Sequence, residues 1–101
     1  DNTLASAMSI VSEVTMTAGI PVICGERNQV VGGGTATLGI DYFNLGQQTG
    51  EMAVRVLNGE KTADMPIEAQ KEFEYAINKT VCDLLGINIP EELLGFAFET
   101  E

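Results

Sequence analysis

Apolar residues recur at three- and four-residue spacing in the first part of the chain, between residues 4 and 18. The series consists of Leu4, Met8, Val11, Val14 or Thr15, and Ala18. This spacing places them on one face of a helix. Asp1-Asn2-Thr3 offers three possible N-caps, and Gly19 followed by Pro21 provides the stop. We therefore predict a first helix over about residues 4–18.

The two apolar runs that follow have the character of β-strands. The first is Pro21–Gly25, which would be buried on both faces in a parallel sheet. The second covers residues 35–40 and is rich in Thr and aliphatic side chains. Residues 26–34 between them are polar and glycine-rich, which favours a solvated loop over a lid formed by Glu26 and Arg27. The order of helix and strand predicts an α/β fold.

The strongest helical pattern covers residues 42–58, with Gly59 as its stop. Gly46 and Gly50 lie four residues apart on this helix, and each costs about 1 kcal/mol of helix propensity. We therefore expect the helix backbone to pack closely against a neighbour at these glycines. The apolar stripe of the helix consists of Leu45, Thr49, Met52 or Ala53, and Val56.

An alternating segment follows a charged turn over residues 60–66. It lies within residues 67–77 and has the period of a β-strand with one face covered. We therefore predict a half-exposed edge strand. The covered set is Phe73, Tyr75 and Ile77, and the alternating set is Glu72, Glu74 and Ala76.

The end of the chain predicts a second, shorter helix. Asn78 is suited to cap it, the helix covers residues 79–85, and Gly86 ends it. Residues 87–90 are predicted to be extended. Residues 91–98 form one last turn or a tail.

Composition narrows the class of protein. The chain has 101 residues and 45% apolar content, which suits one small globular domain. Fifteen acidic residues against five basic ones give a net charge of −10, so a phosphate backbone would be repelled. We therefore exclude nucleic acid as a partner. No apolar run approaches the roughly 20 residues that a membrane-spanning helix needs.

Metal, cofactor and catalytic chemistry find no support in the sequence. Histidine is absent, and Cys24 and Cys82 lack metal-binding spacing, so no zinc site is expected. We interpret the two thiols as small buried groups without a disulfide. Gly32-Gly33-Gly34 precedes a strand and lacks the lysine of a phosphate loop, so it predicts a turn. Without a nucleophile elbow or a histidine base, we expect no enzyme and no cofactor.

The junction around Asp41 is the most informative local pattern. A buried strand ends there and a helix begins, and ligands of open α/β sheets bind outside such strand ends. Asp41 caps the helix through the N–H of Asn44, contacts a ligand, or does both. Tyr42 offers a flat face to an aromatic ligand, although a ring beside a helix start often only packs.

A second candidate region is the start of the chain. Any residue of Asp1-Asn2-Thr3 would cap the first helix, but a helix N-terminus also binds a carboxylate, and an adjacent Asp holds an ammonium. The turn therefore suits an amino acid zwitterion. Glu26, after the first strand, faces the same presumed crevice. The predicted ligand-binding residues are thus Asp1, Asn2, Thr3, Glu26, Asp41 and Tyr42.

Short motifs along nearly the whole chain carry a family resemblance. They are Asp1-Asn2-Thr3-x-Ala5-Ser6, Ile20-Pro21-Val22, Ala36-Thr37-Leu38-Gly39-Ile40-Asp41-Tyr42, Leu45-Gly46, Gln48-Thr49-Gly50-Glu51-Met52-Ala53, Leu57-x-Gly59-Glu60, Met65-Pro66-Ile67-Glu68, Ile77-Asn78 and Leu85-Gly86-Ile87-x-Ile89-Pro90. With these motifs the chain resembles the substrate-binding proteins of ABC transporters of the tryptophan and aromatic amino acid type.

The resemblance implies the type I periplasmic-binding-protein fold, in which two α/β lobes joined by three crossovers close on a ligand like a hinge. Each lobe of this fold is a three-layer α/β/α arrangement with a mostly parallel sheet. About residues 1–40 and 74–101 would belong to the C-terminal lobe, and about residues 42–66 would cross to the N-terminal lobe. Because such proteins are considerably longer and this chain starts on a helix cap, we expect a C-terminal fragment.

The resemblance also implies a function, which is capture of an amino acid-like ligand, aromatic or hydrophobic, for an ABC permease. The full-length protein would be extracytoplasmic, at the bacterial surface or in the periplasm, and lipid-anchored through an N-terminus outside this chain. Family members tend to carry an acidic residue where this chain has Asn44, a departure that affects helix capping but not Asp41.

Two other functions fit an α/β chain of this kind. One is the ligand-sensing effector domain of a transcription regulator with the same fold, and the other is an enzyme subunit. As a fragment, the 101-residue chain is also expected to self-associate, because its long helix would belong to a lobe outside this chain and the apolar stripe of that helix has nothing of its own to cover it.

Overall fold

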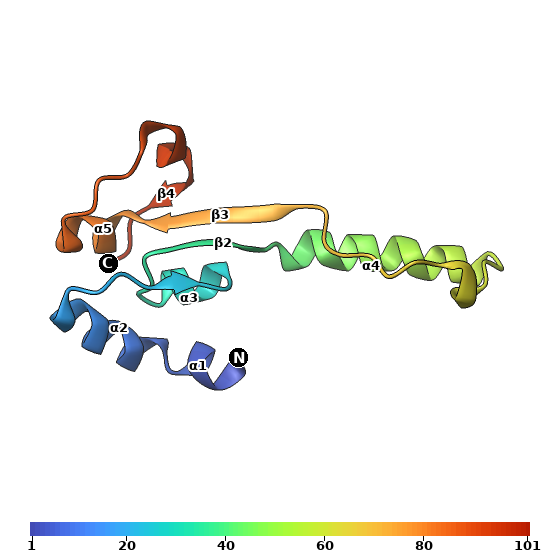
Figure 1. The fold of residues 1–101 in the computed structure, drawn as a ribbon, viewed down its shortest axis with the longest axis horizontal. Coiled ribbons are helices and arrows are strands. Elements are labelled where there is room, and N and C mark those ends of the chain that lie inside the picture. Colours follow the sequence, from blue (N-terminus) through green and yellow to red (C-terminus); the bar gives the residue numbers. More distant parts are fainter. The chain divides into compact units, whose positions relative to one another are not determined.

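The computed structural model describes all 101 residues, which fall into two compact units (Figure 1). The first unit contains residues 1–39 and 74–101, and the second contains residues 40–73. The first is a sheet with helices, and the second is built on one long helix.

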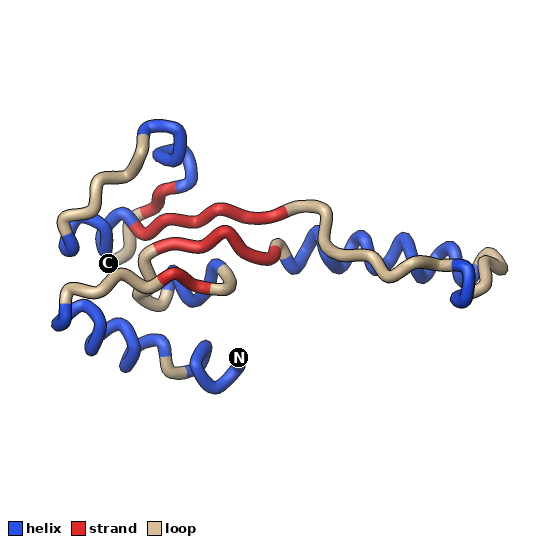
Figure 2. The backbone as a smooth tube through the Cα atoms, viewed as in Figure 1, coloured by secondary structure: helices blue, strands red, loops and turns tan.

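The sheet has four strands in the order β1-β2-β3-β4 (Figure 2). β1 pairs with β2 in parallel, with Ile23 opposite Ala36, and β3 pairs with β4 in parallel, with Ile77 opposite Ala97. The predicted α/β class with a mostly parallel sheet is confirmed. The strands are β1 (Ile23–Cys24), β2 (Ala36–Ile40), β3 (Phe73–Asn78) and β4 (Ala97–Phe98).

The predicted first helix is two helices, α1 (Asn2–Ser6) and α2 (Met8–Ala18). The break is at Ala7, which has φ −106° and ψ 14°. Just before it, the Ser6 hydroxyl donates to the Thr3 carbonyl at 2.9 Å, a side-chain bond of the kind that competes with helix continuation. α2 ends as predicted on Gly19, which has the left-handed φ of 70°.

The prediction of a loop over residues 26–34 is wrong in its first half, which forms α3 (Arg27–Val31). The glycine triplet after it makes the predicted turn. Gly33 has φ 115°, and a Cβ there would lie 2.5 Å from the Cβ of Ser12 in α2. A Cβ at Gly34 would overlap Sγ of Cys24. The triplet therefore permits α2, α3 and β1 to approach closely.

The short helix α5 (Lys79–Leu85) matches its prediction, with Asn78 as the N-cap and Gly86 as the left-handed C-cap. β4 follows a 3₁₀ helix, η2 (Glu91–Phe96), in the segment that was predicted as a turn or a tail. A strand of two residues has no periodicity to detect.

Two strand predictions are corrected by the order of the sheet. β1 is an edge strand with Ile23 75% exposed, not a strand buried on both faces. β3 is an inner strand, and Phe73 and Tyr75 are exposed while Ala76 and Ile77 are buried. The core of the first unit consists of Met8, Val30, Ala76, Ile77, Val81 and Cys82.

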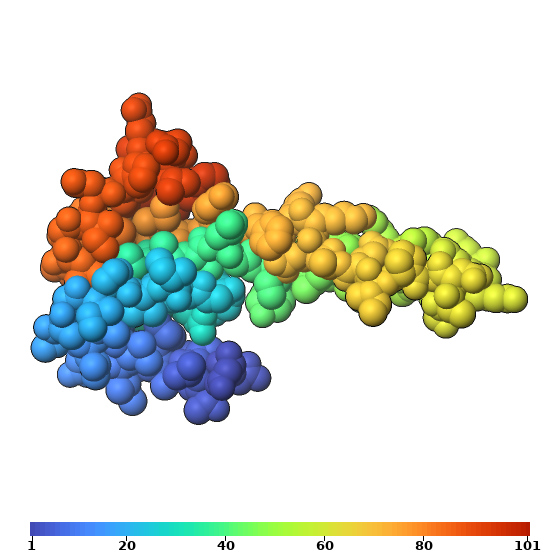
Figure 3. Space-filling view, viewed as in Figure 1, coloured from blue at the N-terminus to red at the C-terminus, as the bar shows by residue number.

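The second unit consists of α4 (Tyr42–Leu57), the 3₁₀ helix η1 (Thr62–Asp64) and the segment that returns to β3. Figure 3 shows the green atoms of α4 and the yellow and orange atoms of the returning segment against each other. No residue from Ile40 to Phe73 is buried. A Cβ at Gly46 or Gly50 would meet no atom within 4 Å, so this chain does not contain the close neighbour expected there.

Candidate ligand-binding site

The start of the chain is a capped helix end. The Asp1 carboxylate accepts the N–H of Leu4 at 3.0 Å, so Asp1 is the N-cap among the three candidates. Asn2 and Thr3 are exposed. Because α1 has only five residues, its dipole is small, and the charge offered to a ligand here is that of the Asp1 carboxylate itself.

The end of β1 is held by two side chains of the following turn. Glu26 accepts the N–H groups of Asn28 at 2.9 Å and Gln29 at 3.0 Å, which makes it the N-cap of α3. The Gln29 side chain in turn accepts the N–H of Gly25 at 2.9 Å. Glu26 is therefore neither a lid residue nor part of a solvated loop. Gln29 at the third helical position is the only part of a capping box that the sequence shows, and Glu is not among the preferred N-caps, so the sequence signal for this short helix is weak.

A cavity of about 250 Å³ lies at this end of the first unit. Asp1 and Gln29 are the polar residues of its lining, and the rest consists of apolar residues of α1 and α2 and of residues 22–25 in and beside β1. Of the predicted site residues only Asp1 lines it. The full lining is Asp1, Leu4, Met8, Val11, Val22, Ile23, Cys24, Gly25 and Gln29.

The thiol of Cys24 in this wall is not poised for chemistry. Burial raises its pKa, and the nearby Glu26 carboxylate raises it further. Cys82, on α5, is also free and has its pKa raised by burial. Both thiols are unbonded, as predicted, although Cys24 is only partly buried.

Arg27 is engaged within the first unit. It makes an ion pair with Glu74 of β3 at 3.1 Å, and its guanidinium lies 5.0 Å from the centre of the Phe98 ring. Tyr75 and Phe96 stack beside these strands with ring centres 4.9 Å apart. The interpretation of Arg27 as a solvated loop residue is corrected by these contacts.

Asp41, at the start of the second unit, is a helix cap with both oxygens in use. Oδ1 accepts the N–H of Asn44 at 3.1 Å, as predicted, and Oδ2 accepts the Asn44 side-chain amide at 2.8 Å. That amide also donates to Glu72 at 2.8 Å. Tyr42 is 63% exposed, so most of its surface is accessible.

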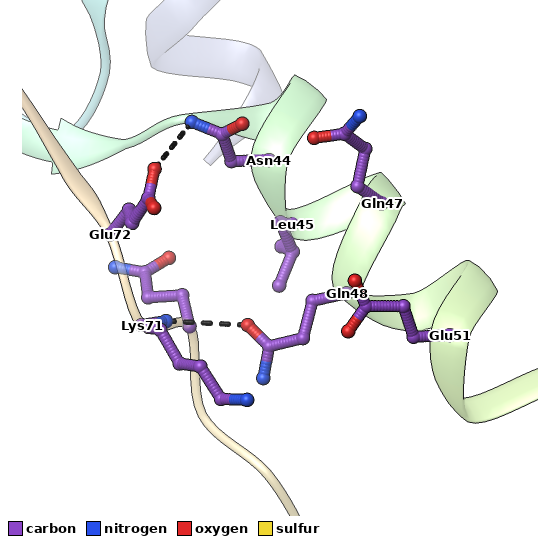
Figure 4. A pocket seen from close by; sticks show the side chains of 8 residues that line it. Asn44, Leu45, Gln47, Gln48, Glu51, Lys71 and Glu72 are labelled. Atoms are coloured by element: carbon purple, nitrogen blue, oxygen red, sulfur yellow. Dashed lines mark hydrogen bonds between the residues drawn. The ribbon is translucent and has the colours of Figure 1, made fainter.

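The first turns of α4 and the returning segment enclose a small polar cavity of about 140 Å³ (Figure 4). Gln48 bridges the two sides, donating to the Ala69 carbonyl at 2.9 Å and accepting the N–H of Lys71 at 3.3 Å. The Glu68 carboxylate accepts a hydrogen bond from the Gln48 amide at 3.1 Å and one from the Arg55 guanidinium at 2.5 Å. The hydrogen bond from Arg55 lowers the pKa of Glu68, and the one from Gln48 lowers it further.

Further along α4, the second unit has an apolar groove of about 520 Å³. Its apolar lining includes Met52, Val56, Met65 and Ile67, and Ile67 is fully exposed. The groove carries no group that would orient a charged ligand except Glu68 at its margin, which is already paired with Arg55.

Two further features of the structure concern metal ions and membranes. No group of three or more Cys, Asp or Glu side chains is arranged to hold a metal ion. No helix combines the length and the apolar character needed to cross a membrane.

Comparison with known proteins gives a consistent result. A family model described as ABC transporter substrate binding protein matches residues 1–101. A tyrosine-binding protein of Clostridioides difficile is 42% identical over 87 residues, which are 86% of this chain and 25% of that protein.

Solved structures of substrate-binding proteins are also similar to this chain. The ligand-free, open structure of a substrate-binding protein with adhesive properties from Clostridium difficile is 39% identical, with a TM-score of 0.78. A Streptococcus pneumoniae ABC domain in complex with L-Trp is 37% identical, with a TM-score of 0.80. Each comparison covers all of this chain and 34% of the other, so this chain spans about a third of the length of these structures.

Proposed function

The chain belongs to the ABC transporter substrate-binding protein family, and from this premise we propose that it is part of a protein that captures an aromatic or hydrophobic amino acid for an ABC importer. The observation that carries the proposal is the likeness, at 37% identity and a TM-score of 0.80, to a domain in complex with L-Trp. The 42% identity to a tyrosine-binding protein supports the same ligand class. Proteins of this family bind and release their ligands without catalysis.

We assign the first unit to the C-terminal lobe of a two-lobe protein and the helix α4 with its connection to the N-terminal lobe. The division of the chain near residues 40 and 73 supports this assignment. In the full-length protein the ligand would bind in the cleft between the lobes, and a permease would accept the closed form. The substrate-binding protein of such an importer works outside the cytoplasm. We propose that this protein is attached to the membrane by a lipid on a segment before Asp1.

The proposed ligand contacts are Asp1, Asn2, Thr3, Glu26, Asp41 and Tyr42. A carboxylate that caps a helix can still bind an ammonium, because its two oxygens offer about four lone-pair positions. Asp41 accepts two hydrogen bonds from Asn44, which leaves acceptor capacity for a ligand. The exposed ring of Tyr42 supplies a stacking surface for an aromatic side chain.

The test is calorimetry on the full-length protein with L-tryptophan, L-tyrosine and L-glutamate. Asp41→Asn should weaken binding of the aromatic amino acids at least tenfold, about 1.4 kcal/mol, because the ammonium loses a charged partner. Thermal stability should change little, because Asn is as good an N-cap as Asp. Asp64→Asn, in the exposed helix η1, is the matched control with no expected effect.

Two results would contradict different parts of the proposal. Unchanged affinity in Asp41→Asn would show that Asp41 is only a cap. A wild-type protein that binds no amino acid would remove the proposed ligand class, whatever the variants do.

A further inference from the structure

Asn44 supplies both hydrogen bonds that the Asp41 side chain accepts. Its backbone N–H lies 3.1 Å from Oδ1 of Asp41, and its side-chain Nδ2 lies 2.8 Å from Oδ2. The first bond caps α4. The second bond is not needed for the cap, but it fixes the rotation of the carboxylate. One residue therefore determines where both oxygens of Asp41 point.

Glu72 determines which end of the Asn44 amide faces Asp41. A primary amide has a donor end and an acceptor end, whereas an ionised carboxylate only accepts hydrogen bonds. Nδ2 of Asn44 also donates to Oε2 of Glu72 at 2.8 Å (Figure 4). The reversed amide would place its oxygen against both carboxylates. The favourable orientation is thus the one with Nδ2 towards Asp41.

No other group holds the Asp41 side chain. It accepts no hydrogen bond besides the two from Asn44, and none of the ion pairs of the chain includes it. Asp41 and Asn44 are both partly buried, which strengthens a hydrogen bond between them relative to one in water. Without the amide, the carboxylate would lose more rotational freedom on binding an ammonium, and this loss lowers affinity. The Asn44 amide therefore preorganises the carboxylate.

We propose that Asn44 is a positioning residue for ligand binding, which holds the Asp41 carboxylate in the orientation that accepts the ammonium of the amino acid, and that Glu72 orients the Asn44 amide. This inference rests on the proposed function, because it requires Asp41 to contact the ligand. The three residues belong to the same compact unit, residues 40–73, so their arrangement is internal to that unit.

The test is calorimetry on the full-length protein with L-tryptophan and L-tyrosine. Asn44→Ala removes the amide but keeps the backbone N–H that caps α4, and alanine is a better helix former than asparagine. Affinity should fall about fivefold, which corresponds to the net value of one hydrogen bond. Gln47→Ala is the matched control, because Gln47 is an exposed amide of α4 that lines the same polar cavity and makes no side-chain hydrogen bond. Its affinity should equal that of wild type.

A double-mutant cycle separates positioning from a structural role. In the Asp41→Asn protein the charge that the amide positions is absent, so adding Asn44→Ala should change affinity less than about twofold. Glu72→Ala should cause a smaller loss than Asn44→Ala, and no further loss when Asn44 is already alanine.

The outcomes distinguish this inference from the proposed function. A wild-type protein that binds neither amino acid removes both. If Asp41→Asn weakens binding and Asn44→Ala does not, the proposed function stands and the positioning role is excluded. If Asn44→Ala causes the same loss with and without the Asp41 charge, Asn44 acts on the fold or on the ligand itself. If the loss from Glu72→Ala persists without Asn44, Glu72 does not act through the amide.

Discussion

Replacing Asn78 by alanine is expected to lower the free energy of unfolding of the first unit by about 3 kcal/mol. Asn78 is fully buried at the end of β3. Its Oδ1 accepts the N–H of Val81 at 3.1 Å and the hydroxyl of Thr100 at 3.2 Å, and its Nδ2 donates to the Val30 carbonyl at 3.1 Å. One carboxamide thus connects α3, α5 and the end of the chain.

The expected loss of stability is the sum of the costs of the hydrogen bonds that Asn78→Ala removes. Alanine orphans the N–H of Val81, a residue that is 6% exposed, and an unsatisfied buried donor costs about 2 kcal/mol. The Val30 carbonyl keeps a second partner, the N–H of Gly33 at 3.1 Å, so only the net value of one hydrogen bond, about 1 kcal/mol, is lost there. The Thr100 hydroxyl can turn to water.

Asn78→Ser separates the contribution of the cap at Val81 from that of the hydrogen bond to the Val30 carbonyl. Serine is a comparable N-cap but cannot reach the Val30 carbonyl with a donor in the same place, so its loss should be about 1 kcal/mol. Urea unfolding followed by circular dichroism at one fixed protein concentration measures both variants, because self-association makes stability depend on concentration. Asn58→Ala, at the exposed end of α4, is the control. A loss below about 1 kcal/mol for Asn78→Ala, or equal losses for Ala and Ser, would refute the reasoning.

Two further predictions concern the glycine turn and the second unit. Gly34→Ala should lower the free energy of unfolding by about 2 kcal/mol because its methyl group overlaps Sγ of Cys24, and Cys24→Ala in the same chain should recover part of the loss. Gly95→Ala, where a Cβ meets open space, is the control, and no recovery in the double variant would show that the thiol is not the obstacle. For the second unit, Arg55 holds the pKa of Glu68 below its usual 4.5, so the stabilisation by this carboxylate is present above that value and is lost as the pH falls through the lowered pKa. Glu68→Gln should therefore lower the stability of α4 at neutral pH and leave it equal to that of wild type in acid. Hydrogen exchange of the α4 amides measures this stability. A loss of protection that is the same at both pH values would contradict the ion pair.

Helix ends were the most predictable part of this fold, because capping is a local property. The sequence predicts Asn78 as a cap and offers Asp41 as either a cap or a ligand contact, and each of the two side chains accepts the N–H three residues on. Gly19 and Gly86 were identified as stops, and both have the left-handed conformation. Each of these arrangements depends only on neighbouring residues and needs no tertiary contact to be inferred.

The strand faces were not predictable in the same way. The alternation predicts Phe73, Tyr75 and Ile77 as the covered face of β3, but the elements that pack on a strand decide which of its residues are buried. Phe73 and Tyr75 are exposed, whereas the three consecutive residues Ala76, Ile77 and Asn78 at the end of the strand are all buried. β3 lies between β2 and β4. A two-residue partner such as β4 leaves no trace in the sequence, so the position of β3 in the sheet could not be inferred.

For the candidate site, the carboxylates were recognisable but their partners were not. The spacing predicts the backbone N–H of Asn44 as a partner of Asp41, but it does not predict that the Asn44 side-chain amide connects Asp41 with Glu72, which is 28 residues away from it. Nor does the sequence indicate that the Gln29 side chain accepts the N–H of Gly25 at the end of β1. Such long-range or loop contacts depend on the folded arrangement rather than on spacing.

The bridge that Asn44 makes between Asp41 and Glu72 also has a consequence for the order of folding. β2 and β3 are adjacent in the sheet but separated in the chain by the whole second unit, and pairing between distant segments is slow because a long loop must close first. A helix such as α4 forms locally within about a microsecond. Once it has formed, the Asn44 bridge brings the residue after β2 next to the residue before β3. Contacts within the second unit therefore shorten the loop that has to close before β2 and β3 can pair.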